Sequence, residues 1–103
     1  ITNPDDLTVT CKVGGELVAE DTTRYYNYKV AEVVSFISQF HTLLPGDVIS
    51  LGTAFKPGQG RKSIHQANFQ TVAGPVEVAI EGLGLQENPI VIEEKELGAW
   101  RLP

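Results

Sequence analysis

The chain has 103 residues, of which 42% are apolar and 20% are charged, a balance typical of one small globular domain rather than of a disordered chain. Eight lysines and arginines stand against thirteen aspartates and glutamates, so the net charge is −5. This excess of negative charge argues against binding to duplex nucleic acid or to an anionic membrane. No apolar run approaches the roughly 20 residues that a transmembrane helix needs. The single cysteine, Cys11, has no partner for an internal disulfide, which favours a reducing compartment such as the cytoplasm.

An antiparallel hairpin is predicted near the start of the chain, after a turn cluster at 3–6. Apolar and polar residues alternate over 7–13, as they do in a strand with one buried face. The apolar set comprises Leu7, Val9, Cys11 and Val13. Gly14 and Gly15 follow, and both can adopt the positive φ that a tight two-residue turn requires. The return strand is predicted over 16–20.

A helix is predicted between a polar, aromatic segment at 21–28 and Pro45. Its apolar residues recur at steps of three and four, as on the core-facing side of a helix. They are Val30, Val33, Val34, Ile37, Phe40 and Leu44. Asn27 is expected to cap the first turn, because its side-chain oxygen can accept a hydrogen bond from a free amide. Pro45 and Gly46 are expected to end the helix, and His41 to be packed against it or to cap its C-terminus.

Three further strands are expected in the second half of the chain. A short apolar run at 47–51 precedes Gly52 and Thr53, and a second run at 76–81 alternates with its valines and isoleucine inward. Glycines at 82 and 84 break that run, and a last strand is expected over 89–92. Strands, one amphipathic helix and further strands give an α+β fold that is mostly β.

The chemistry-bearing motifs are few. The sequence has no P-loop, no dinucleotide-binding glycine motif and no Cys/His cluster with zinc spacing. Cys11 lies on an apolar strand face, which favours a buried structural thiol over a nucleophile. Lys56, Arg61 and Lys62 fall within seven positions of a long polar loop, where they either recruit an anionic substrate or simply lie in solvent. His65 in the same loop is either exposed or in contact with substrate.

Gly52 and Thr53 are the best candidates for a binding site. A strand that runs into Gly-Thr exposes backbone amides together with a hydroxyl, and these donors suit a carboxylate oxygen. Glycine also permits a ligand to approach the backbone closely. The alternative is an ordinary turn at the end of a strand.

The order of these segments resembles the C-terminal half of the fumarylacetoacetate hydrolase family. The matching segments are Asn3–Leu7 with the hairpin Val13–Val18, then Thr22 and Thr23, then Thr42–Ile49 with Leu51–Thr53, and finally Val76–Gly84. The resemblance covers roughly residues 3–92, so we expect residues 1–92 to form the C-terminal half of such a domain and 93–103 to form a C-terminal tail. The chain departs from the family at Ala54–Gly58, where Pro-x-Gly-Val is usual, and at Gly74 and Pro75, where Gly-Asp is usual.

This resemblance implies a mixed β-sandwich roll and a homodimer. It also implies metal-dependent chemistry on 2,4-dioxo or 2-hydroxymuconate-like acids: hydrolysis of a C–C bond, decarboxylation or enol–keto isomerisation. Mg²⁺ or Mn²⁺ is the implied metal, a hard cation that prefers oxygen ligands. The family's metal ligands, a Glu-x-Glu pair and a later Asp, lie upstream of the segment that matches Asn3. We therefore expect no metal ligand in this chain, whereas Gly52 and Thr53 match positions that hold the substrate carboxylate.

Two hypotheses about function follow. In the first, the chain is part of such an enzyme and completes a site whose metal ligands lie on a missing N-terminal segment or on a second chain. In the second, it is a non-catalytic scaffold or assembly fragment with the same fold. The chain lacks methionine and begins at Ile1, so we expect a fragment or the C-terminal product of a longer precursor.

Overall fold

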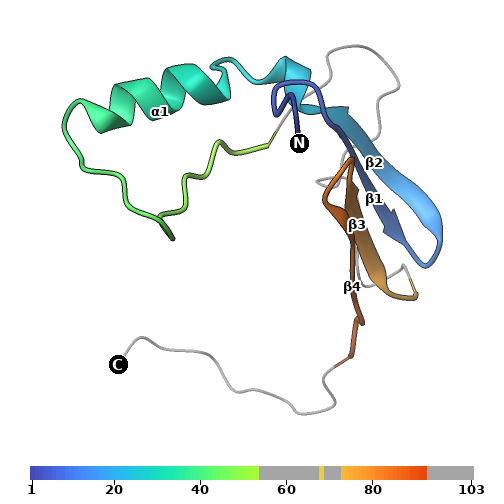
Figure 1. Ribbon diagram of the computed structural model, residues 1–103. Coiled ribbons are helices and arrows are strands. Elements are labelled where there is room, and N and C mark those ends of the chain that lie inside the picture. Colours follow the sequence, from blue (N-terminus) through green and yellow to red (C-terminus); the bar gives the residue numbers. More distant parts are fainter. Residues whose placement is uncertain (54–67, 69–72, 93–103) are drawn as a thin grey trace, which may run out of the picture.

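The computed structural model describes residues 1–53, 68 and 73–92. Its elements are β1 (Thr8–Val13), β2 (Glu16–Thr22), the 3₁₀ helix η1 (Thr23–Tyr25), α1 (Val30–Ser38), β3 (Val76–Ile80) and β4 (Gly84–Asn88). The four strands form one antiparallel sheet in the order β2-β1-β3-β4 (Figure 1). This confirms a mostly β chain with one α-helix among the described residues. The sandwich roll stays a prediction, because the described strands form a single sheet.

The first hairpin is confirmed. Gly14 and Gly15 both have positive φ, 57° and 81°, and join β1 to β2. The amide of Gly14 donates to the Pro75 carbonyl at 3.0 Å, which ties the turn to the residues that lead into β3. β2 continues to Thr22, two residues beyond the predicted end, because its last residues still pair with the start of β1.

The core of the described residues lies in the middle of this sheet. Cys11, Val13 and Ala19 are the buried apolar residues, and Val13 is only 1% exposed. Cys11 pairs with Ala19 on one side and Val78 on the other, so a row of small apolar side chains crosses three strands. Burial raises the pKa of the Cys11 thiol by desolvation. The predicted buried structural thiol is therefore confirmed, since a raised pKa disfavours the reactive thiolate.

The second hairpin corrects one sequence prediction. The strand expected over 76–81 is present as β3, but the last strand begins at Gly84 and ends at Asn88, not over 89–92. β4 is an edge strand whose residues are all exposed, and it is held by backbone pairing with β3. Because this pairing needs no apolar side chain, the apolar pattern used to locate strands did not detect β4.

The start of α1 differs from the predicted capping. The N-cap position is Lys29, not Asn27, and the Lys29 amide donates to Glu32 Oε2 at 2.8 Å. The amide of Val30 donates to Asp5 Oδ1 at 2.9 Å. A local carboxylate, Glu32, and a distant one, Asp5, thus accept these amides in place of Asn27, and negative charge at this end of a helix is stabilising.

The helix also ends earlier than predicted. α1 stops at Ser38, whose hydroxyl donates to the Ser35 carbonyl at 2.8 Å. The amides of Phe40 and His41 both turn back to the Ile37 carbonyl, which closes the last turn. Phe40 and Leu44 therefore lie outside the helix, and His41 is exposed rather than packed.

The segment after α1 forms no strand, so the strand predicted over 47–51 is wrong. The chain turns at Pro45 and Gly46, where the Asp47 amide donates to the Leu44 carbonyl at 3.0 Å and Gly46 has φ 97°. From there the chain passes beside α1 and returns toward η1 (Figure 1). No strand of the described sheet pairs with this segment, so its apolar residues have no ladder to join.

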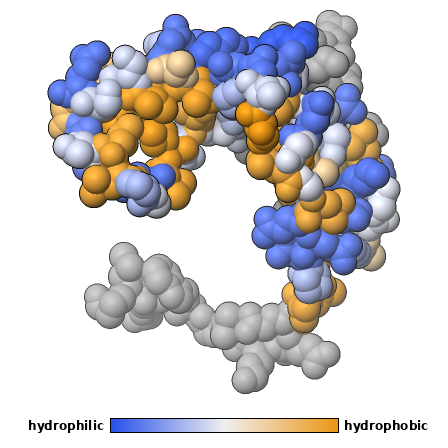
Figure 2. All heavy atoms as spheres, viewed as in Figure 1, coloured by the Kyte–Doolittle hydropathy of each residue, from blue (hydrophilic) through white to orange (hydrophobic). Residues whose placement is uncertain are grey.

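The helix and the segment at 39–53 together form an arm beside the sheet, and apolar surface gathers along it (Figure 2). The exposed large apolar residues of this arm include Val34, Phe36, Phe40, Leu44 and Val48. Phe36 and Phe40 contact each other edge to face, with ring centroids 5.4 Å apart. No helix among the described residues is long and apolar enough to cross a membrane.

Candidate functional site

Gly52 and Thr53 lie at the end of the arm, where it returns to η1. The hydroxyl of Tyr26, just after η1, donates to the Gly52 carbonyl oxygen at 2.9 Å. Both residues are exposed, and Gly52 has φ 80°. A Cβ added at Gly52 would meet nothing within 4 Å, so backbone conformation rather than crowding requires glycine here. The open space leaves the backbone accessible to a ligand.

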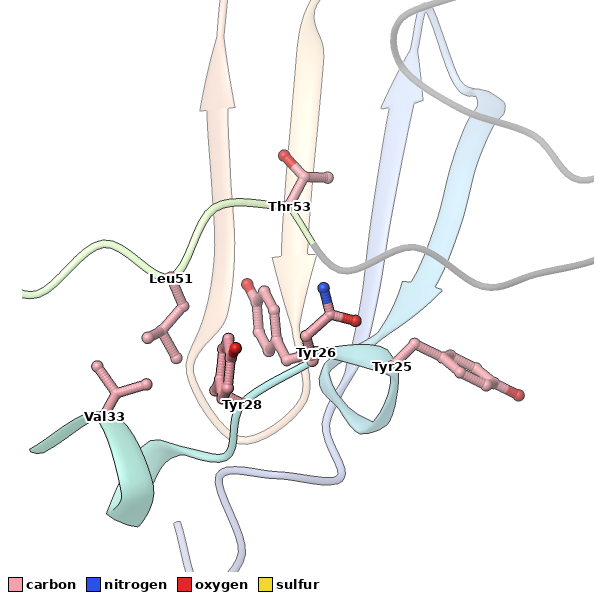
Figure 3. Close-up of a pocket in the computed structure, with 7 residues that line it drawn as sticks. Tyr25, Tyr26, Tyr28, Val33, Leu51 and Thr53 are labelled. Atoms are coloured by element: carbon pink, nitrogen blue, oxygen red, sulfur yellow. The ribbon is translucent and has the colours of Figure 1, made fainter. Parts of the chain in front are cut away.

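A cavity of about 360 Å³ lies between this segment and the residues around η1. Its lining residues are Tyr25, Tyr26, Asn27, Tyr28, Val33, Leu51 and Thr53. Tyr26 and Tyr28 point toward the segment that carries Leu51 and Thr53, whereas Tyr25 points away from it (Figure 3). No role was predicted for these tyrosines from the sequence. Three tyrosines within four positions were the signal that could have drawn attention to them.

The N-terminal turn fixes the position of η1 and therefore of the tyrosines. The Thr23 hydroxyl donates to the Pro4 carbonyl at 2.8 Å and accepts from the Leu7 amide at 2.9 Å. The Arg24 guanidinium contacts both carboxylate oxygens of Asp6, at 2.8 and 3.1 Å. This ion pair is exposed, so we expect it to orient Arg24 more than to stabilise the fold.

Lys56, Arg61, Lys62 and His65 lie outside the described residues. Their recruitment of an anionic substrate stays a prediction.

The described residues do not fit a resident metal ion. Across 1–53, 68 and 73–92, no group of three or more His, Cys, Asp or Glu side chains is placed to hold one. Asp5 and Asp6 contact the residues on either side of the tyrosine segment: the Asp5 carboxylate accepts from the Val30 amide and the Asp6 carboxylate from the Arg24 guanidinium. Both carboxylates are thus already engaged by donors of this chain.

The profile described as fumarylacetoacetate (FAA) hydrolase C-terminal matches residues 1–91. The chain belongs to the fumarylacetoacetate hydrolase family. The Gly-Thr segment and the hairpins of this family member thus fall within the matched range. No solved structure matches the chain.

Curated members of the fumarylacetoacetate hydrolase family are similar to the chain over most of its length. The oxaloacetate tautomerase Fahd2a, mitochondrial, of Rattus norvegicus is 34% identical over 91 residues, which are 88% of this chain and 28% of that protein. The 2,4-didehydro-3-deoxy-L-rhamnonate hydrolase of a Sphingomonas species is 33% identical over 96 residues, 93% of this chain and 33% of that protein. An uncharacterized protein of Methanocaldococcus jannaschii is 37% identical over 93 residues, 89% of this chain and 35% of that protein. The chain thus spans about a third of the length of these relatives.

Proposed function

We propose that this chain is part of a metal-dependent enzyme acting on 2,4-dioxo or 2-hydroxymuconate-like acids, and that Gly52 and Thr53 bind the substrate carboxylate. The reaction is hydrolysis of a C–C bond, decarboxylation or enol–keto isomerisation. Two relatives are named for reactions on oxo acids, a tautomerase of oxaloacetate and a hydrolase of 2,4-didehydro-3-deoxy-L-rhamnonate. A family shared with hydrolases and tautomerases supports an enzyme of this kind.

The exposure and conformation of the Gly-Thr segment carry the proposal. Gly52 has an open flank and a backbone conformation that other residues rarely adopt, and the Thr53 hydroxyl is exposed beside it. An amide and a hydroxyl are donors that match the two oxygens of a carboxylate. In this proposal the chain supplies the carboxylate contact and not the reacting centre.

The Mg²⁺ or Mn²⁺ ion of the proposed enzyme is bound by residues outside this chain, on an N-terminal segment or a second chain. When bound, such an ion supplies a Lewis acid that stabilises negative charge developing on the oxo acid. Apolar side chains exposed along the arm, with Phe36 64% and Val48 91% exposed, are consistent with a larger assembly, and a homodimer is part of the proposal. The tautomerase relative is named as mitochondrial, so the cytoplasmic location stays a prediction.

The experiment is a turnover assay of the complete protein on oxaloacetate, an acylpyruvate and a 2-hydroxymuconate, with Mg²⁺ or Mn²⁺ and then with a chelator. We expect metal-dependent turnover of at least one of these acids, because the implied enolate needs a cation to stabilise it. An unrelated monocarboxylate without an oxo group serves as the negative control. Absence of turnover on all three acids would contradict the proposal and would favour the non-catalytic scaffold.

A further inference from the structure

The hydrogen bond between Tyr26 and Gly52 orients the whole peptide unit between Gly52 and Thr53. Gly52 C=O and Thr53 N–H belong to the same planar peptide unit, and the described residues contain no cis peptide bond. In a trans unit the carbonyl and the N–H point in opposite directions. Since the Gly52 carbonyl accepts from the Tyr26 hydroxyl, the Thr53 N–H points away from Tyr26.

The Thr53 side chain lies on that same far side. It points away from Tyr26 and Tyr28 (Figure 3). Both donors proposed for the carboxylate, the Thr53 amide and the Thr53 hydroxyl, therefore lie on the side of the segment that the tyrosines do not occupy. Tyr26 thus contacts this segment from the side opposite to these two donors.

Tyr26 is itself held in place by neighbouring residues. Tyr26 is half-buried and follows η1 directly. The Tyr26 amide donates to the Thr23 carbonyl at 3.1 Å, and Thr23 is itself bonded through its hydroxyl to the N-terminal turn. No other hydrogen bond to Gly52 is seen within the described part of the chain, and its glycine backbone is conformationally permissive. Among the described residues, the Tyr26 hydroxyl is thus the group seen to hold this peptide unit.

We propose that Tyr26 is a positioning residue: its hydroxyl holds the peptide unit between Gly52 and Thr53 so that the Thr53 amide faces the substrate carboxylate. This inference rests on the proposed function. It assigns Tyr26 no contact with substrate. Its effect reaches the carboxylate only through the backbone of Gly52 and Thr53.

The test compares Tyr26→Phe with Tyr25→Phe in the complete protein. Tyr25 is the matched control, because it is the adjacent tyrosine and its side chain points away from the segment that carries Gly52 and Thr53 (Figure 3). We expect Tyr26→Phe to move the backbone amide resonance of Thr53 in an NMR spectrum. We also expect it to raise KM for the acid about two- to tenfold at unchanged kcat, the worth of one neutral hydrogen bond. Tyr25→Phe should do neither.

The double variant with Thr53→Val separates a positioning role from a general loss of stability. If Tyr26 acts through Thr53, the two substitutions should raise KM by less than the product of their separate effects. The inference is overturned if the Thr53 resonance is unchanged in Tyr26→Phe, if both phenylalanine variants behave alike, or if the effects on KM multiply fully. If Thr53→Val weakens binding and Tyr26→Phe does not, only this inference falls. If Thr53→Val leaves KM unchanged, the proposed carboxylate contact falls as well.

Discussion

Gly14→Ala should destabilise the complete protein by about 3 kcal/mol, the largest effect on stability that we expect from a single methyl group. Gly14 has φ 57°, and a Cβ at this position would overlap the carbonyl oxygen of Ala73. The overlapping atom belongs to the backbone, so the clash cannot be relieved by moving a flexible side chain. The Gly14 amide must also stay bonded to the Pro75 carbonyl, which links the first hairpin to β3.

Gly15→Ala is the control for this substitution. Gly15 has φ 81°, but an added Cβ would meet nothing within 4 Å. It should therefore cost only the backbone strain, about 1–2 kcal/mol. Chemical denaturation of the three proteins measures the difference. Equal midpoints for the two alanine variants would show that the contact between the first turn and Ala73 is not tight.

Thr53→Val should raise KM for the oxo-acid substrate about ten- to a hundredfold, because it removes one hydrogen bond to a charged group worth about 1.5–3 kcal/mol. Valine has nearly the shape of threonine, and the Thr53 side chain is exposed, so the fold should be unaffected. The bond to the carboxylate is made in the bound substrate and in the transition state alike. We therefore expect kcat to change little.

Thr53→Ser keeps the hydroxyl and provides the control for the valine variant. Steady-state kinetics of the complete protein with its metal should give KM for Thr53→Ser close to that of the unaltered protein. If valine and serine give the same KM as threonine, the hydroxyl does not bind the acid. A loss of kcat alone in Thr53→Val would instead place the residue nearer to the reacting atoms.

The two hairpins show which parts of the fold the sequence could predict. Local geometry is visible in the alternation of apolar and polar residues over β1 and β3 and in the pair Gly14 and Gly15. The predicted bounds of these two strands differ from the observed ones by no more than one residue. β4 was missed, because an exposed edge strand needs backbone pairing but no apolar face. The end of α1 was misplaced, because the spacing of Phe40 and Leu44 matches a helix that the chain leaves after Ser38.

In the candidate site, too, local features could be predicted from the sequence and long-range contacts could not. Gly52 and Thr53 were identified as donors at the end of an apolar run, and this local feature needs no knowledge of the fold. Their partner was not found, because Tyr26 lies 26 positions away and meets Gly52 only after the chain turns back. The same holds for Asp5 at the start of α1, where a carboxylate 25 positions away replaces the cap expected from Asn27. Contacts between distant residues leave no periodic signal in one sequence.

The central claim is that this chain provides the carboxylate contact of an enzyme whose metal is bound elsewhere. Measuring Mn²⁺ binding to the complete protein and to residues 1–103 alone tests it most directly. We expect stoichiometric binding by the complete protein and none by residues 1–103, whose described part has no cluster of metal ligands. Tight stoichiometric binding by residues 1–103, or none by the complete protein, would contradict this account.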